Sequence, residues 1–205
     1  MEDKVCYVCA LDFEATCEKE KLIKNQEIIE FPSVLYKVTN MNNENTEYEM
    51  LGEFREFIKP IHNPVLTDFC KELTAITQEE VDNGIDFKQA LRMHIEWLMD
   101  KNVDMENLIF VTCGQWDLKT ALPNNLKLFN LQRACKYYKK IINIKDEYKK
   151  FYKFKTSNLV EMLTKINEEF DGRLHSGLAD TKAVGKLLTR MMNDGHKNFE
   201  IINLY

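Results

Sequence analysis

A nearly uninterrupted apolar run close to the N-terminus most constrains how this chain can fold. Residues 5–14 have the sequence VCYVCALDFE, in which apolar side chains continue until two acids close the segment. Such a run is typical of a central strand that is buried on both faces of a sheet. Two more strand patterns, 27–39 and 48–59, flank a polar turn cluster at 40–45, which predicts a hairpin.

Helix and strand patterns follow along the rest of the chain. Apolar residues recur at helical spacing over residues 87–99, 124–137, 159–170 and 177–192, and a short buried-strand pattern lies at 108–113. Thr156 and Ser157 are cap candidates for the third helix. The order predicts an α/β fold with one mixed sheet of about five strands flanked by helices. No repeat or Pro/Gly/Ser-rich linker divides the 205 residues, so we expect a single domain over 1–205.

Composition argues against several protein classes. A net charge of −5 disfavours a protein that coats duplex nucleic acid. No apolar run is long enough to span a membrane, and the N-terminus lacks the pattern of a secretory signal. Six cysteines are too few for a disulfide scaffold, and the Cys6-x-x-Cys9 pair has no second CxxC with which to hold zinc. We expect an intracellular monomer, cytoplasmic or nuclear, with reduced thiols and no membrane partner.

The two acids that close the apolar run, Asp12 and Glu14, are the first candidates for chemistry. Residues i and i+2 of a strand point to the same face, so both carboxylates emerge together. Two like charges held that close repel each other, and a divalent cation relieves the repulsion. The alternative is a solvated strand end, because the same spacing recurs at Asp104 and Glu106 in a polar stretch.

Three further residues could join such a site. Asp180 lies on the predicted core-facing side of the last helix, where a carboxylate is costly unless it is paired or bound to a metal. His175 lies five residues earlier, in a short loop with Gly177, and Asp117 follows the strand pattern at 108–113. Each also has an ordinary explanation, because the two acids could cap helices and the histidine could be a loop residue.

Together these residues resemble a known family. An Asp-x-Glu pair on the first strand, an Asp after a later strand and a His-x4-Asp near the C-terminus form the pattern of the DEDDh 3′-to-5′ exonucleases. The surrounding sequence is similar to the Eri-type group, which includes the histone-mRNA 3′-end exonuclease. The similar stretches are LDFEATC at 11–17, EFP at 30–32, DFC at 68–70 with Leu73 and Thr74, ITQ at 76–78, WD at 116–117 and INI at 142–144.

This resemblance covers about residues 5–195, which correspond to the nuclease core without the RNA-binding SAP module that some relatives carry. Gln115 and Ala179 depart from the family pattern, and neither is a ligand position. The resemblance implies a ribonuclease H-like fold. It also implies a metal-dependent 3′-to-5′ exoribonuclease that releases nucleoside 5′-monophosphates from 3′-hydroxyl ends.

The resemblance also assigns roles to the five candidate residues. Two Mg²⁺ ions, for which Mn²⁺ can substitute, would be held by Asp12, Glu14, Asp117 and Asp180. Glu14 would bridge the ions and take part directly in catalysis. His175 would be the general base, since an ordinary imidazole has a pKa of about 6.5 and can accept a proton at neutral pH.

The implied substrate is an RNA 3′ end, single-stranded or with a short overhang. The residues expected to line the pocket for its last nucleotide are Phe13, Ala15, Thr16, Leu73, Thr74, Trp116 and His175. Trp116 could stack on a base or lie in the core. The lysines of residues 136–155, which alternate with aromatic side chains, are either a track for the RNA backbone or a solvated surface.

Two other functions fit the same residues. A DNA-directed DEDDh exonuclease would have the same fold and metal site, because the contact that distinguishes ribose from deoxyribose is local. The other is a catalytically silent RNA-binding protein of this fold. The presence of all five catalytic residues disfavours this alternative. Mg²⁺-dependent release of mononucleotides would distinguish an enzyme from such a silent binding protein.

Overall fold

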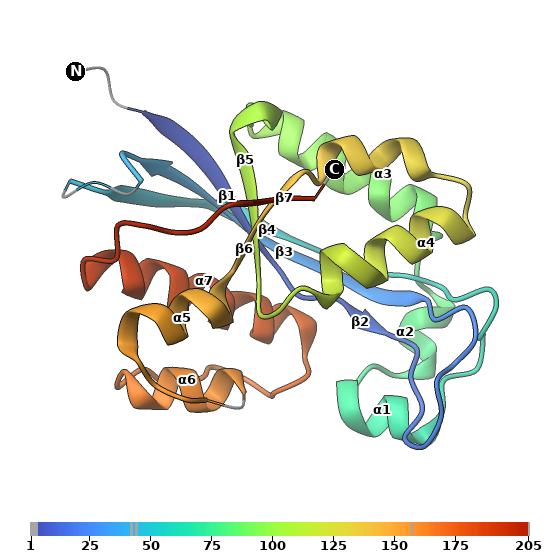
Figure 1. Cartoon of the computed structure of the whole chain (residues 1–205). Coiled ribbons are helices and arrows are strands. Elements are labelled where there is room, and N and C mark those ends of the chain that lie inside the picture. Colours follow the sequence, from blue (N-terminus) through green and yellow to red (C-terminus); the bar gives the residue numbers. More distant parts are fainter. Residues whose placement is uncertain (1–3, 42, 44, 157, 205) are drawn as a thin grey trace.

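The computed structural model describes residues 4–41, 43, 45–156 and 158–204, and a single mixed sheet lies at its centre (Figure 1). The strands in this part of the chain are β1 (Val5–Leu11), β2 (Glu14–Ala15), β3 (Ile28–Thr39), β4 (Glu47–Phe57), β5 (Leu108–Thr112), β6 (Lys140–Asn143) and β7 (Ile202–Asn203). They follow the order β2-β3-β1-β5-β6-β7, and β4, which is outside this order, also pairs with β3. The sheet is parallel from β1 through β5 to β6 and antiparallel elsewhere.

The central position predicted for the N-terminal strand is confirmed, because β1 lies between β3 and β5. Successive side chains of a strand point to opposite faces. Val8 and Ala10 therefore enter one hydrophobic core, while Cys9 and Leu11 enter the other. All four are fully buried, which explains why the strand carries no alternation of apolar and polar residues.

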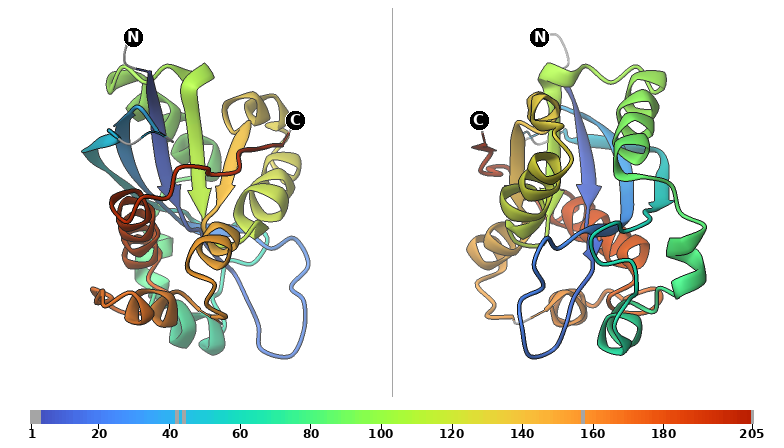
Figure 2. Two further views of the ribbon diagram at one scale, coloured as in Figure 1. Left: turned by 60° about the vertical axis from the view of Figure 1, so that its left-hand side comes forward. Right: turned by 90° about the vertical axis from the view of Figure 1, so that its right-hand side faces the viewer.

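Helices cover both faces of the sheet. They are α1 (Asp68–Thr74), α2 (Gln78–Asp82), α3 (Phe87–Asp100), α4 (Leu122–Leu128), α5 (Ile144–Tyr152), α6 (Leu159–Lys165) and α7 (Gly177–Asn193). The core on one face joins the strands to α5, α6 and α7, and the core on the other joins them to α3 and α4. Figure 2 shows α7, in red, and α3, in green, on opposite sides of the strands. A smaller apolar cluster lies under α1 and α2.

The predicted helix over residues 124–137 is wrong as one continuous helix, because the structure divides it into two pieces. The structure has α4 as far as Leu128, and Asn130 then adopts a left-handed backbone with φ of 59°. A 3₁₀ helix, Gln132–Tyr137, follows. An α-helix cannot continue through a left-handed residue, and asparagine adopts that conformation more readily than most residues.

The third predicted helix is shorter than its apolar stripe. α6 ends at Lys165, and Asn167 has a left-handed φ of 57°. Its N-cap is Asn158, whose side chain accepts the N–H of Glu161, rather than Thr156. Ser157, the other predicted cap, lies outside the described residues.

The described part of the sheet has seven strands rather than about five. β2 and β7 have two residues each, too few for a periodic signal, and β6 has four. The predicted strand over residues 5–14 ends at Leu11 and resumes as β2, which begins at Glu14. None of the described helices is both long and apolar enough to cross a membrane.

Candidate active site

Four carboxylates from separate segments lie together at one edge of the sheet. Asp12 directly follows β1, and Glu14 begins β2. Asp117 begins a π-helical turn, Asp117–Ala121, in the connection after β5, and Asp180 lies in the first turn of α7. β1 and β5 are parallel, so the segments that follow them leave the sheet at the same edge. The charges of Glu14, Asp117 and Asp180 all act on Asp12, which places the four acids in one cluster.

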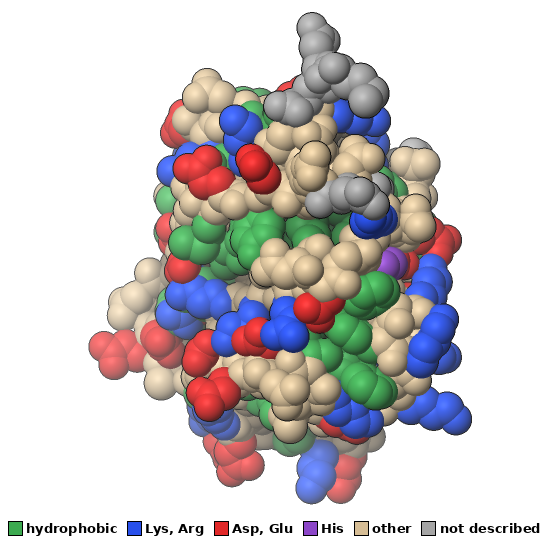
Figure 3. Space-filling model, turned by 90° about the vertical axis from the view of Figure 1, so that its left-hand side faces the viewer, with side chains coloured by type: hydrophobic (Ala, Val, Ile, Leu, Met, Phe, Trp, Pro, Cys, Tyr) green, Lys and Arg blue, Asp and Glu red, His purple; other side chains and the backbone are tan. Residues whose placement is uncertain are grey.

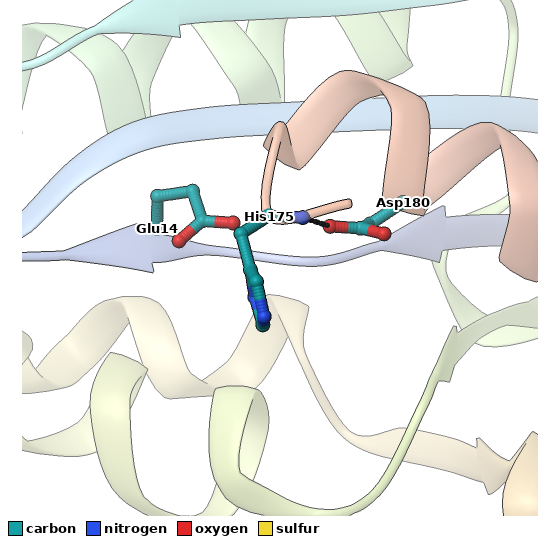
Figure 4. A group of neighbouring side chains, drawn as sticks. All are labelled: Glu14, His175 and Asp180. Atoms are coloured by element: carbon teal, nitrogen blue, oxygen red, sulfur yellow. Dashed lines mark hydrogen bonds between the residues drawn. The ribbon is translucent and has the colours of Figure 1, made fainter. Parts of the chain in front are cut away.

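His175 lies within this cluster. Glu14, His175 and Asp180 offer ligand atoms that all lie within 4.8 Å of one another (Figure 4). The backbone N–H of His175 donates to Oδ2 of Asp180 at 2.7 Å, and the imidazole is exposed. The backbone of His175 is left-handed, with φ of 63°, which costs about 1–3 kcal/mol for a residue other than glycine. The surrounding contacts hold this strained conformation, which directs the N–H toward Asp180.

Asp117 is tied to the segment that carries the first two acids. Its Oδ1 accepts the backbone N–H of Phe13 at 2.9 Å. Because Phe13 lies between Asp12 and Glu14, this bond holds three of the four carboxylates in one arrangement. The turn that presents Asp117 is π-helical, a rare geometry that is frequent at functional sites.

Burial raises the pKa of all four carboxyl groups. The pKa of Asp12 is raised well above its ordinary value by burial and then by the neighbouring acids. Burial, followed by the charges of Asp180 and Glu30, raises the pKa of Glu14 to about 9. Burial raises the pKa of Asp117 to about 6, and burial and the charge of Glu30 raise that of Asp180 to about 7. Ionising the whole cluster therefore costs the folded protein free energy that a bound cation would offset.

The residues of this cluster fit a divalent metal ion. Among the described residues, Oδ1 of Asp180 is one of two buried side-chain polar atoms without a hydrogen-bond partner. A buried carboxylate oxygen without a donor is costly, and a cation satisfies it. The donors are carboxylate oxygens, which Mg²⁺ and Mn²⁺ prefer.

Three residues predicted for the nucleotide pocket turn their side chains into the protein. Phe13 is buried and packs edge-on against Phe31, with the ring centroids 4.8 Å apart. The hydroxyl of Thr16 accepts the backbone N–H of Glu27. Thr74 is buried, and its hydroxyl donates to a backbone carbonyl within α1. The side chains at these positions are therefore not available to a ligand.

Ala15 and Trp116, which adjoin Glu14 and Asp117 in the sequence, instead line an open cavity of about 700 Å³. Its other lining residues are Leu22, Ile23, Asn25, Gln26, Thr120, Ala121, Asn124, Asn125, Lys127 and Leu128. Trp116 is 38% exposed, which settles the choice between a core residue and an available ring. Leu73 is partly exposed on α1 and does not line this cavity.

The lysines of residues 136–155 do not form one continuous basic surface. Lys139 and Lys140 both donate to Glu106. Lys150 pairs with Glu147, at 3.0 Å, and with Glu200. On the face drawn in Figure 3, acidic side chains are interspersed among the basic ones. Lys145 lies near the acid cluster, because its charge acts on the thiol of Cys113 together with those of Asp12, Asp117 and Asp180.

One residue of the cluster was missed by the sequence reasoning. Glu30 is fully buried on β3, and its charge contributes to the raised pKa values of Asp12, Glu14 and Asp180. The available signal was an acid within the apolar stretch IIEFPSVL, since a carboxylate on a buried strand needs a partner.

Comparisons with known proteins agree with this geometry. A family model described as Exonuclease (RNase_T) matches residues 9–188. The 3′-5′ exoribonuclease 1 of Mus musculus is 38% identical over 193 residues, which cover 92% of this chain and 54% of that protein. The 3′-5′ exonuclease Snipper of Drosophila melanogaster is 33% identical over 205 residues, covering 92% and 70%. The chain thus spans about half the length of the first of these relatives.

A solved structure matches the fold as well as the sequence. The nuclease domain of 3′hExo, a DEDDh family member bound to rAMP, is similar with a TM-score of 0.84 and 36% identity over 96% of both chains. The expected ribonuclease H-like exonuclease fold is therefore confirmed. By its sequence, its fold and its cluster of four acids and one histidine, this chain belongs to the exonuclease family, as a DEDDh member of the Eri type.

Proposed function

We propose that this chain is a metal-dependent 3′-to-5′ exoribonuclease that releases nucleoside 5′-monophosphates from the 3′-hydroxyl end of RNA. The observation that carries the proposal is the buried cluster of acids with His175 beside it. Further support comes from relatives named as a 3′-5′ exoribonuclease and a 3′-5′ exonuclease. A third relative was solved with bound rAMP.

Two Mg²⁺ ions, or Mn²⁺ in their place, are the cofactors we propose. Asp12, Glu14, Asp117 and Asp180 would hold them, and Glu14 would be the acid shared by both ions. Bound there, the ions would neutralise charge at the phosphorus and at the departing oxygen. The observation behind this assignment is the raised pKa of every carboxyl group in the cluster.

His175 is the general base of the proposed reaction. Its imidazole takes a proton from the attacking water, the water oxygen bonds to phosphorus, and the bond from phosphorus to the 3′ oxygen breaks. The departing 3′ oxygen takes its proton from solvent. Partial desolvation by the surrounding protein, and then the charge of Arg173, lower the pKa of His175 below 6.5, so the imidazole is mostly neutral and able to accept a proton at pH 7.

The cavity beside Trp116 is the site we propose for the last base of the RNA. The exposed indole offers a stacking face, worth about 1–3 kcal/mol per base. Ala15 lines the same cavity, whereas Leu73 lies outside it, on α1. Phe13 and Thr16, whose side chains are buried, flank Ala15 and hold the segment that presents it, whereas Thr74 is engaged within α1.

The substrates we propose are single-stranded RNA 3′ ends and short overhangs, acted on by a monomer inside the cell. All six cysteines are free thiols, which fits a reducing compartment. A DNA-directed exonuclease and a silent RNA-binding protein are the alternatives that the experiment separates.

The test is digestion of matched RNA and DNA oligonucleotides that carry a label at the 5′ end. We expect a ladder that shortens from the 3′ end of RNA, needs Mg²⁺ or Mn²⁺, stops on chelation and fails with Ca²⁺ alone, whose coordination is longer and looser. A 3′-phosphate should block it. Faster digestion of DNA would favour the DNA-directed alternative, and early release of the labelled nucleotide would contradict the polarity.

The two Asp-x-Glu pairs of the chain give a matched control for this assay. Asp12→Ala should abolish cleavage, because it removes a carboxylate from the cluster. Asp104→Ala should leave cleavage unchanged, because Asp104 only caps a short surface 3₁₀ helix, Met105–Asn107. Activity of Asp12→Ala within tenfold of the parent would refute the ligand assignment.

A further inference from the structure

Glu30 is a buried acid that adjoins the catalytic carboxylates while both of its oxygens are engaged elsewhere. It lies on β3 with no exposed surface. Oε1 lies 2.7 Å from Nε of Arg55 on β4, and Oε2 accepts the backbone N–H of Gly177 at 3.1 Å. With an ion pair on one oxygen and a hydrogen bond on the other, Glu30 is not arranged as a metal ligand.

The hydrogen bond from Gly177 attaches the start of α7 to the sheet. Gly177 is the first residue of the helix, and the N-cap Ser176 makes no side-chain hydrogen bond to it. Glu30 therefore supplies from β3 the acceptor that a cap residue usually supplies, and its charge faces the positive end of the helix. A β-carbon on Gly177 would lie 2.9 Å from Oε2 of Glu30 and 3.1 Å from the backbone oxygen of Asp12. Only glycine allows this close approach.

Arg55 provides the counter-charge for Glu30. Its side chain is 40% exposed, and its guanidinium stands over the ring of Phe57, 4.6 Å from the centroid. Without it, Glu30 would add a fifth uncompensated charge beside the four carboxylates. The ion pair of Glu30 and Arg55 thus places a hydrogen-bond acceptor at the start of α7 and adds little net charge to the site.

We propose that Glu30, with Arg55 as its counter-ion, is a positioning residue that fixes the N-terminus of α7 on the sheet. Gly177 lies two residues after His175 and three before Asp180, so holding its N–H holds both groups. The roles of His175 and Asp180 as base and metal ligand rest on the proposed function. Because Glu30 acts through the helix, its loss lowers the turnover number and leaves the KM for RNA nearly unchanged.

Three variants separate this role from a general loss of stability. Glu30→Ala removes the acceptor, and a misplaced catalytic group costs about 10²-fold in kcat. In Glu30→Gln the amide oxygen can still accept the N–H of Gly177 while Arg55 turns to solvent, so the loss is less than about tenfold. Glu53→Gln is the matched control, because Glu53 also joins β4 to α7, through a half-exposed pair with Lys182 at 2.9 Å, and we expect no change in kcat.

Hydrogen exchange provides a readout that does not depend on catalysis. Amides of residues 175–181 should exchange faster in Glu30→Ala than in the parent, and at the parental rate in Glu53→Gln. Unchanged kcat and exchange in Glu30→Ala, or equal effects in the control, would overturn the proposal. If the parent cleaves no RNA, the proposed function fails and exchange alone decides the positioning role. If Glu30→Ala does not fold, Arg55→Gln replaces it, and unchanged kcat and exchange there overturn the proposal.

Discussion

The charge of Asp180 works against folding when no metal is bound. Burial raises its pKa from 3.8 to about 7, so the folded protein binds more protons than the unfolded chain within this range. Stability from this group therefore falls as the pH rises through that window and stays low above it. We expect Asp180→Asn to stabilise the metal-free protein by about 1–3 kcal/mol at pH 8, because asparagine can still accept the N–H of His175.

Urea unfolding in a chelator at pH 8 and pH 5 measures this difference, which should be smaller at pH 5. Mg²⁺ should stabilise the parent and have much less effect on the variant. An Asp180→Asn protein less stable than the parent at pH 8 without metal would contradict the electrostatic account.

His175→Ala distinguishes a general base from a residue that only binds metal. The single-turnover rate should fall by about 10²–10⁴-fold, while the affinity for RNA stays nearly unchanged. In the parent, only the neutral imidazole accepts a proton, so the rate should rise with pH through a value below 6.5 and then level off. The variant should lack this rising limb. His62→Ala, which changes an exposed histidine far from the cluster in sequence, is the control. Loss of RNA binding in proportion to rate would exclude the role of base.

At the residue scale, the clustering of the four acids and His175 was easier to predict than their surroundings. Asp12 and Glu14 share one side of an extended segment, so Phe13 between them has to face the core, and strand alternation alone could have excluded its side chain from the pocket. Glu30 could not be assigned in the same way. Its partner Gly177 is 147 residues away, and no local pattern reports that contact.

At the element scale, the start of α7 depends on close packing rather than on a capping side chain. Gly177→Ala places a β-carbon within 3.1 Å of three atoms, which belong to Glu30 and Pro32 of β3 and to Asp12 just after β1. This substitution should lower the free energy of unfolding by about 1–3 kcal/mol and remove much of the activity. Ser176→Ala should change the free energy of unfolding by less than about 0.5 kcal/mol, because its side chain caps nothing. Denaturant unfolding of both variants tests this, and equal destabilisation would contradict it.

Element boundaries were harder to predict than element types. The apolar stripes of residues 124–137 and 159–170 continue beyond α4 and α6, and a left-handed asparagine follows each helix. α5 was missed because lysines dominate its exposed side, although Ile144 and Tyr148 anchor it in the core. Periodicity measures burial on one side and does not specify the backbone conformation that stops a helix.

At the scale of the whole molecule, the stability of the fold at low pH depends on a histidine buried between the sheet and the helices that cover it. His94 of α3 is fully buried between Ser33 of β3 and Tyr138, each with an atom 3.0 Å from its ring. Burial lowers its pKa from 6.5 to about 3. The unfolded chain binds the extra proton in this range, so stability from this group is complete above pH 6.5 and is lost as the pH falls toward 3.

We expect the free energy of unfolding of the parent to fall more steeply than that of His94→Gln below pH 6.5, by about 1.4 kcal/mol per pH unit. Urea unfolding of both proteins between pH 4 and 7 measures the two slopes. Parallel slopes would show that His94 does not titrate on unfolding.

The order of the segments around the site has a consequence for synthesis. Asp12 and Glu14 are synthesised long before His175, which precedes α7, and Asp180, which lies on it, and α7 packs on β1, β3 and β5 only when its residues are available. A growing chain therefore carries an incomplete acid cluster until α7 has emerged. The proposed cleavage therefore requires that α7 has been synthesised and has packed on the sheet.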